Sequence, residues 1–447
     1  MFNKVLIANR GAIAARVVRA LRQMKIASVV VYSEADRDLP YVVQADEAIC
    51  IGEAAPAASY LNVDALSAAI RKSGADAVHP GYGFLSENPD FATAVSALGV
   101  TFIGPDARWL RAMGRKTDAR ALMASLGMPL NPSSGVLAGT PDQQLAAVRN
   151  VGFPVLVKPV AGGGGIGMLP VRDEAQVVDA LERARSMSQR SFGNADVYVE
   201  RLIERPRHIE FQLLADKYGQ VRHLFERDCS IQRRHQKVIE ESPAPHLPRA
   251  LIEETGTRIA RILSELGYDV IGTAEMLYAQ DGSLSFLEMN TRLQVEHAVT
   301  EAITGIDLVQ AQIRLAAGMR LDAVLPASIE ASGHAIEVRV YAEDPRRFFP
   351  SPGPLDVFRP PTAHGVRIET GYAEGNRVTP FYDPMLAKVI VHEATREQAI
   401  ARMLDALTAF EVVGVKTNIP FAADVLRSDV FQAGDVHTQL GSALTRA

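Results

Sequence analysis

The segment Thr273-Ala274-Glu275-Met276-Leu277-Tyr278, followed by Leu284-Ser285-Phe286-Leu287-Glu288-Met289-Asn290, contains two strand-like runs separated by a turn with Asp281-Gly282. This pattern predicts a β-hairpin. If Asp281 and Gly282 form a two-residue turn, the register places Glu275 directly opposite Glu288 on one face of the hairpin. The two carboxylates repel each other in this position, because the Cβ atoms of the two glutamates lie only about 5 Å apart.

A cation bound between the two carboxylates would remove this repulsion. Asn290 lies two residues beyond Glu288 and therefore on the same face of the strand. Two carboxylates and a carboxamide oxygen form an oxygen-only ligand set that suits Mg²⁺ shared with substrate phosphates. We therefore predict a metal site at Glu275, Glu288 and Asn290. A pair of solvated charges at a sheet edge is the alternative, although the flanking residues have the composition of buried strands.

A glycine run, Gly162-Gly163-Gly164-Gly165, follows an apolar strand-like segment that contains Lys158. Glycines allow backbone N–H groups to approach phosphate oxygens closely, and a neighbouring lysine adds a positive charge. The run matches neither the Walker A loop nor the dinucleotide-binding fingerprint. It predicts a phosphate-covering loop that could act as a lid, and a plain flexible hinge is the alternative.

Two polar clusters accompany these motifs. Residues 226–237 combine charged and hydrogen-bonding side chains, a pattern for which a solvated face is the more common explanation. Residues 290–297 continue directly from the hairpin and must lie near the predicted cation. There Arg292 could hold a small anion, Gln294 could orient it and Glu296 could accept a proton.

The first hundred residues alternate short apolar strands with amphipathic helices. Strands are expected at residues 4–8, 27–32, 75–79 and 100–103, with helices at 12–24, 63–72 and 91–98. This alternation predicts a parallel sheet covered on both faces, in which ligands bind beyond the carboxyl ends of the strands. The loop at 79–84 follows one of these ends and is either a ligand loop or a simple Gly/Pro turn.

Composition narrows the class of protein. The 447 residues include 47 Lys and Arg against 52 Asp and Glu, a net charge of −5, which argues against a broad nucleic-acid or anionic-membrane surface. Hydrophobic residues make up 47% of the chain, as in globular proteins, and the length suggests about three domains. With only two cysteines and no pattern of a signal peptide or membrane span, we expect a cytoplasmic protein without nucleic-acid or membrane partners.

Together these segments resemble the biotin carboxylase family of the ATP-grasp superfamily. The matching stretches, at residues 4–11, 79–88, 162–168, 226–241, 288–300 and 333–345, extend over essentially the whole chain. The resemblance implies an α/β and α+β fold in three parts. These are an N-terminal Rossmann-like parallel sheet at 1–114, an ATP-grasp domain at 115–332 whose mobile glycine-loop lid covers about 131–202, and a strand-rich C-terminal domain at 333–447.

The resemblance also implies a reaction in which ATP phosphorylates bicarbonate and the resulting carboxyphosphate carboxylates biotin on a carrier protein. The implied nucleotide-binding residues are Lys116, Lys158, Gly163, Gly164, Gly165, Glu200, His208, Gln232, His235 and Leu277. The implied bicarbonate-binding residues are Lys237, Arg292, Gln294 and Val295. Glu296 matches the general base, Arg339 the residue that stabilises the biotin enolate, and Tyr82 and Gly83 the biotin-contacting loop. Glu275, Glu288 and Asn290 match the positions that bind Mg²⁺, or Mn²⁺ in its place.

Some residues depart from the usual family pattern. Ala12 replaces a Glu common in members that act on acyl-CoA, and Ile166 replaces an Arg usual in the glycine loop. The motifs at 9–14 and 161–168 instead look like the urea carboxylase branch, so the final acceptor is expected to be an acyl-CoA or a urea-like amide. The chain has no Met-Lys-Met biotinylation motif. We therefore expect a separate biotin carboxyl carrier protein and carboxyltransferase subunits, and the resemblance implies a homodimer.

Two other functions remain as alternatives. One is another ATP-grasp ligase that uses bicarbonate or a carboxylate. Such an enzyme would not require both Arg339 and Tyr82. The other is a nucleotide-binding regulatory subunit that lost turnover together with the arginine of the glycine loop.

Overall fold

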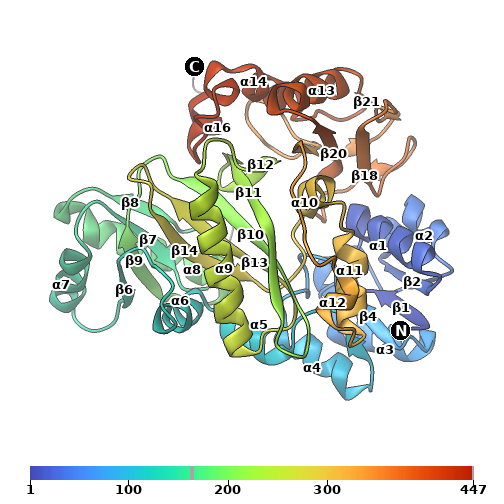
Figure 1. The fold of residues 1–447 in the computed structure, drawn as a ribbon, viewed down its shortest axis with the longest axis horizontal. Helices are drawn as coiled ribbons and strands as arrows, with labels where there is room; N and C mark the ends of the chain where they lie inside the picture. Colours follow the sequence, from blue (N-terminus) through green and yellow to red (C-terminus); the bar gives the residue numbers. More distant parts are fainter. Residues whose placement is uncertain (162–165, 445–447) are drawn as a thin grey trace.

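The computed structural model describes residues 1–161 and 166–444, and it begins with a five-stranded parallel sheet in the order β3-β2-β1-β4-β5 (Figure 1). The strands are β1 (Lys4–Ile7), β2 (Ala27–Tyr32), β3 (Glu47–Cys50), β4 (Ala77–His79) and β5 (Thr101–Phe102). The helices are α1 (Gly11–Met24), α2 (Pro40–Gln44), α3 (Val63–Ser73), α4 (Pro89–Ala97) and α5 (Ala107–Gly114). Val5 and Ile7 of β1 pack into the core that contains α1, while Leu6 packs with α3 and α4. The prediction of a parallel sheet covered on both faces is therefore confirmed.

A small unit with its own core follows α6 (Lys116–Ser125). Its four-stranded antiparallel sheet has the order β6-β9-β7-β8. The strands are β6 (Ser133–Val136), β7 (Val155–Pro159), β8 (Leu169–Val171) and β9 (Val197–Arg201), and the helices are α7 (Pro141–Val151) and α8 (Val177–Phe192). In Figure 1 this unit lies beside the main body, at the end of the molecule opposite α1 and α2.

The centre of the molecule is an eight-stranded antiparallel sheet in the order β14-β13-β10-β11-β12-β15-β20-β18. Its strands are β10 (Arg207–Ala215), β11 (Val221–Arg233), β12 (Gln236–Ser242), β13 (Val270–Tyr278), β14 (Leu284–Asn290), β15 (His334–Tyr341), β18 (Val366–Thr370) and β20 (Met385–Glu393). The long helix α9 (Arg249–Leu266) lies across the sheet in Figure 1 and buries Ile259 and Leu263 against Phe211 and Met276. Since side chains alternate along a strand, the residues between these apolar positions, such as Glu210 and Glu275, point to the other face.

The predicted hairpin corresponds to β13 and β14, and Glu275 is paired with Glu288 as expected. The turn, however, is longer than the predicted two residues. The N–H of Ala279 donates to the carbonyl of Ser283 at 2.9 Å, which leaves three residues in the loop, and Gly282 has a φ of 85°. A register shift between Glu275 and Met276 adds one residue to β14 and restores the pairing. The prediction of the pair was correct, and the prediction of the turn was wrong.

The remaining elements surround this sheet. Helices α10 (His297–Thr304), α11 (Leu308–Ala316) and α12 (Leu321–Val324) precede β15, which joins β12 with Ile239 opposite Val338. Two small sheets pair β16 (Gly353–Pro354) with β19 (Arg377–Val378) and β17 (Val357–Arg359) with β21 (Glu411–Val413). Helices α13 (Arg396–Thr408), α14 (Ile419–Arg427), α15 (Asp429–Gln432) and α16 (Leu440–Leu444) complete the chain. Within the described ranges, no helix has the length and hydrophobicity to cross a membrane.

Candidate active site

Three glutamates surround the ammonium group of Lys237 on the face of the central sheet opposite α9. Its Nζ donates to Glu210 Oε2 at 2.6 Å, to Glu275 Oε1 at 2.7 Å and to Glu296 Oε1 at 2.8 Å. Register shifts in the pairing of β11 with β12 interrupt the simple alternation just before Lys237. Such irregularities change the direction in which a side chain points. Here they lie next to Lys237, which contacts carboxylates on two other strands and one loop.

Glu296 is completely buried between two cations. Its second carboxylate oxygen, Oε2, accepts from Arg339 Nη2 at 2.8 Å. Burial alone would raise the pKa of Glu296, but the charges of Lys237, Arg339 and Arg227 outweigh it and keep the pKa well below its ordinary value. The carboxylate is therefore ionised and able to accept a proton.

The predicted metal ligands lie on neighbouring strands with their carboxylates already paired to lysines. Lys116 Nζ lies 2.9 Å from Glu288 Oε2, and Lys237 holds Glu275. Burial opposes ionisation of Glu275, but Lys237 and His208 keep its pKa well below the ordinary value. Asn290 Oδ1 accepts from Arg292 at 3.2 Å. Two carboxylates in cross-strand register with a carboxamide beside them fit a hard divalent cation such as Mg²⁺.

The predicted nucleotide-binding residues gather around a second ion pair. Lys158 Nζ lies 3.0 Å from Glu200 Oε2, and both side chains are buried. Burial lowers the pKa of Lys158, and the positive charge of Lys116 adds to this effect. The charged form of a lysine near another cation is stabilised when an anion, such as a phosphate group, binds beside it.

His208, Gln232, His235 and Leu277 lie nearby on the sheet. His208 Nδ1 is 2.9 Å from Gln232 Nε2, and Leu277 is paired with His208 across β10 and β13. His235 lies in the β11–β12 turn, where burial and the charge of Lys158 lower its pKa. Gly163, Gly164 and Gly165 lie outside the described residues.

Arg292 is held in one orientation by four acceptors, among them Asn290 Oδ1 and the backbone carbonyl of Leu293. Its Nε donates to Glu87 Oε2 at 2.8 Å, and its Nη1 donates to Gln294 Oε1 at 2.8 Å. Gln294 in turn donates to Glu275 at 3.2 Å. The backbone carbonyl of Val295 accepts from the buried Lys388 at 2.5 Å. The residues predicted to bind a small anion therefore lie beside the predicted metal ligands and Glu296.

The 79–84 loop is fixed by Asn9, which donates to the carbonyls of Pro80 at 2.7 Å and Tyr82 at 2.8 Å. The hydroxyl of Tyr82 is buried and has no hydrogen-bond partner among the described residues. Burial raises the pKa of Tyr82 well above its ordinary value, and Arg339 is one of the charged groups near enough to act on it. Gly83 is exposed beside it, with a φ of 69°.

Four contacts of this site were not predicted from the sequence. They involve Glu210 with Lys237, Glu87 with Arg292, Glu240 with Arg339 and Lys388 with Val295. Glu210 carries a local signal, because it alternates with His208 on one strand. The partners of the other three are remote in the sequence, and no local pattern identifies them.

Comparison with known proteins gives three matching family models. They are the biotin carboxylase N-terminal domain at residues 1–110, the carbamoyl-phosphate synthase L chain ATP-binding domain at 115–324 and the biotin carboxylase C-terminal domain at 337–441. The chain is 48% identical over 438 residues to a biotin carboxylase of Halalkalibacterium halodurans, covering 98% of this chain and 97% of the relative. It is 46% identical over 439 residues to a pyruvate carboxylase subunit of Methanothermobacter thermautotrophicus, covering 98% and 89% of the two chains.

A solved structure gives the same result. The biotin carboxylase domain dimer of the Hydrogenobacter thermophilus 2-oxoglutarate carboxylase, in complex with MgADP, ADP and bicarbonate, has a TM-score of 0.95. It is 42% identical, and the match covers 99% of this chain and 98% of that one. Sequence, fold and the arrangement of ionised side chains on the central sheet agree, and the chain belongs to the biotin carboxylase family of ATP-grasp enzymes.

Proposed function

We propose that this chain catalyses the ATP-dependent carboxylation of biotin, with bicarbonate as the carbon source and carboxyphosphate as the intermediate. The observation that carries the proposal is Glu296, a fully buried carboxylate between Lys237 and Arg339. A base flanked by two cations suits a reaction that deprotonates one anion and then stabilises another.

In this proposal Glu275, Glu288 and Asn290 hold Mg²⁺, or Mn²⁺ in its place, which neutralises charge on the ATP phosphates. Lys116 and Lys158 would bind phosphate oxygens, and the lowered pKa of the buried Lys158 supports an added negative charge beside it. The remaining proposed nucleotide contacts are Gly163, Gly164, Gly165, Glu200, His208, Gln232, His235 and Leu277.

Bicarbonate binds beside Arg292, with Gln294, the Val295 backbone and Lys237 around it. The contact with Glu87 supports this role, because it fixes the plane of the Arg292 guanidinium and leaves less freedom to lose on binding. An oxygen of bicarbonate attacks the terminal phosphorus of ATP, the bond to the bridging oxygen breaks, and ADP leaves. The proton of bicarbonate moves to a carboxylate oxygen of Glu296.

Biotin binds at the other end of this region. Arg339 would stabilise the negative oxygen of the biotin enolate, an electrostatic contribution typically worth about 3–4 kcal/mol. The unpaired hydroxyl of Tyr82 supports a ligand at this position, because a buried hydroxyl without a partner is costly until one binds. Gly83 would let the same loop lie close to the biotin ring.

We further propose the division into domains at 1–114, 115–332 and 333–447, with a lid at about 131–202. The separate core of the small four-stranded unit supports this lid, because such a unit can move as one body. Closure would keep water from carboxyphosphate, which hydrolyses readily.

The partners are proposed to be a biotin carboxyl carrier protein, carboxyltransferase subunits and a second copy of this chain. The Hydrogenobacter domain is a dimer, which supports the homodimer. For the acceptor we propose a urea-like amide, from the motifs at 9–14 and 161–168, with an acyl-CoA as the second candidate. Because two relatives are named for pyruvate and 2-oxoglutarate, a 2-oxo acid should also be tested as the acceptor in the assay.

The proposal is tested by incubating the protein with ATP, Mg²⁺, free biotin and labelled bicarbonate. We expect acid-labile label in biotin and ADP release that requires bicarbonate. ADP release that is indifferent to bicarbonate, or a failure to label biotin while ATP binds, would contradict the proposal.

A further inference from the structure

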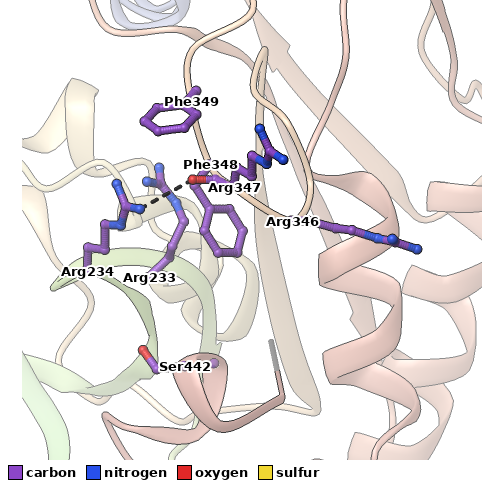
Figure 2. A pocket seen from close by; sticks show the side chains of 8 residues that line it. Arg233, Arg234, Arg346, Arg347, Phe348, Phe349 and Ser442 are labelled. Atoms are coloured by element: carbon purple, nitrogen blue, oxygen red, sulfur yellow. Dashed lines mark hydrogen bonds between the residues drawn. The ribbon is translucent and has the colours of Figure 1, made fainter. Parts of the chain in front are cut away.

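A hollow of about 410 Å³ lies outside the residues assigned to the candidate active site (Figure 2). It is bounded by the β11–β12 turn, by the loop after β15 and by helix α16. The lining residues are Arg233, Arg234, Arg346, Arg347, Phe348, Phe349, Gly441 and Ser442. Four arginines and two phenylalanines around one cavity are unusual in a chain whose net charge is −5.

One of the four arginines is neutralised and fixed. Arg233 lies 2.6 Å from the buried Glu343, and its guanidinium stacks 5.1 Å from the centre of the Phe348 ring. The nearby Asp344 forms an ion pair with Lys416 at 2.8 Å. Asp383 accepts from Gln236, the first residue of β12, and is not part of the lining. Among the described residues, no carboxylate forms an ion pair with Arg234, Arg346 or Arg347, although the charge of Arg234 acts on Glu343 and opposes the rise that burial causes in its pKa.

Arg234, Arg346 and Arg347 supply positive charge around the hollow, although the Arg346 side chain points away from Arg234 in Figure 2. Arg234 Nη2 donates to the backbone carbonyl of Arg347 at 3.3 Å, a contact that links the two walls of the hollow (Figure 2). Within residues 1–161 and 166–444, the side chains of Arg346 and Arg347 are exposed and have no recorded ion pair. Phe349 is 59% exposed beside them, which is a large apolar surface to leave in water.

We propose that this hollow is a second anion-binding site that takes a phosphate monoester with an aromatic or similarly flat apolar group. Several arginines without an ion pair in the described part of the chain favour a ligand with more than one negative charge, and the guanidinium fork matches phosphate oxygens. The exposed Phe349 ring provides a face on which a flat group can stack. The volume falls in the range of about 300–1,000 Å³ typical of small-molecule sites, which favours a small ligand over a flat protein surface.

The test uses the full chain with saturating MgADP, so that the candidate nucleotide site is filled. Phenyl phosphate and inorganic phosphate are titrated by calorimetry into the wild type, the double variant Arg346→Gln/Arg347→Gln and the variant Phe349→Ser. Arg71→Gln on α3 is the matched control, because Arg71 is exposed and has no ion pair recorded in the described part of the chain. All of these side chains are exposed, so the variants should fold.

We expect one saturable phenyl phosphate site in the wild type and in Arg71→Gln. The double variant should bind both probes at least about tenfold more weakly, because it loses two charge-assisted contacts. Phe349→Ser should weaken phenyl phosphate while inorganic phosphate stays within about twofold. Absence of saturable binding, or equal affinity in the wild type and the double variant, would overturn the proposal.

Two further outcomes would also count against it. If Phe349→Ser weakens both probes equally, the flat apolar group is refuted and the ligand is a simple phosphate. If the double variant binds phenyl phosphate normally but raises the KM for a biotinylated carrier, the hollow is a docking surface for a protein and the small-ligand proposal fails.

Discussion

Replacing Glu296 by Gln should separate nucleotide binding from carboxylation. The carboxylate oxygens each lie 2.8 Å from a cation, Lys237 Nζ on one side and Arg339 Nη2 on the other. The amide has nearly the same shape but cannot accept the proton of bicarbonate. Loss of a general base costs about 10²–10⁴ in rate, so we expect turnover to fall by about 10³, equivalent to about 4 kcal/mol of barrier.

The variant should still fold, because neither cation loses all of its partners. Lys237 keeps Glu210 and Glu275, and Arg339 keeps Glu240 as a neighbour, although burial raises the pKa of Glu240 to about 8. The loss of unfolding free energy should therefore be smaller than the roughly 3–5 kcal/mol that is lost when a buried charge has no partner left.

Labelling of free biotin gives the rate for Glu296→Gln, and calorimetry with MgADP on the same preparation gives the affinity. The control is Glu226→Gln, which also removes a buried carboxylate paired with an arginine, Arg249, but on the α9 side of the sheet. Turnover of Glu296→Gln within tenfold of the wild type would remove Glu296 from the role of base. An equal loss of MgADP affinity in both variants would instead indicate general damage to the fold.

Three further predictions concern other contacts of the site. Glu288→Lys should abolish metal-dependent turnover, because it places a second ammonium group beside Lys116; biotin labelling across a range of Mg²⁺ concentrations measures this, and turnover like that of the wild type at low Mg²⁺ would argue against Glu288 as a ligand. Glu87→Gln should raise the KM for bicarbonate about tenfold, because Arg292 loses a charge-assisted bond, while the KM for ATP stays within about twofold; exposed Asp90→Asn is the control, and equal changes in both constants would contradict the assignment. Burial raises the pKa of Glu240 to about 8, above the roughly 4.3 of an exposed glutamate. The folded protein thus keeps a proton that the unfolded chain releases, and wild-type stability declines as pH rises through this window. Glu240→Gln lacks this decline. The unfolding free energy of the variant relative to the wild type, measured by urea denaturation, should therefore be higher at pH 8.5 than at pH 5.5. A difference between the two proteins that does not change with pH would refute the shifted pKa.

Local patterns predicted much of the fold. The short apolar runs and the amphipathic helices between them predicted most elements of the N-terminal sheet, because strands buried on both faces leave continuous apolar segments. β3 (Glu47–Cys50) escaped prediction, since its residues are mostly exposed and it lies at the sheet edge. The continuation of the central sheet from β12 into β15 was also not predicted, because pairing between distant strands leaves no local pattern.

The site was predictable where its residues are close in sequence. The repulsion expected between Glu275 and Glu288 depended on a register that the structure confirms, although the turn that suggested it has a different length. Glu87 and Arg292 are 205 positions apart, and only the packing of the N-terminal sheet against the central one brings them together. Lys237 reaches the glutamates through irregular strand pairing, which sequence alternation alone would not reveal.

The ion pairs of the site suggest how it could both remain folded without substrate and act when substrate arrives. The cations Lys116, Lys237 and Arg339 are each held by a carboxylate, so none of these three charges is left alone. ATP and bicarbonate are anions and compete for these cations. On the proposed assignment, each lysine or arginine that turns to a substrate releases a carboxylate beside that substrate, Glu288 for the metal and Glu296 for the proton. Release of Lys237 and Arg339 also removes two of the charges that lower the pKa of Glu296, so the base becomes stronger when the substrates bind, while Arg227 remains beside it.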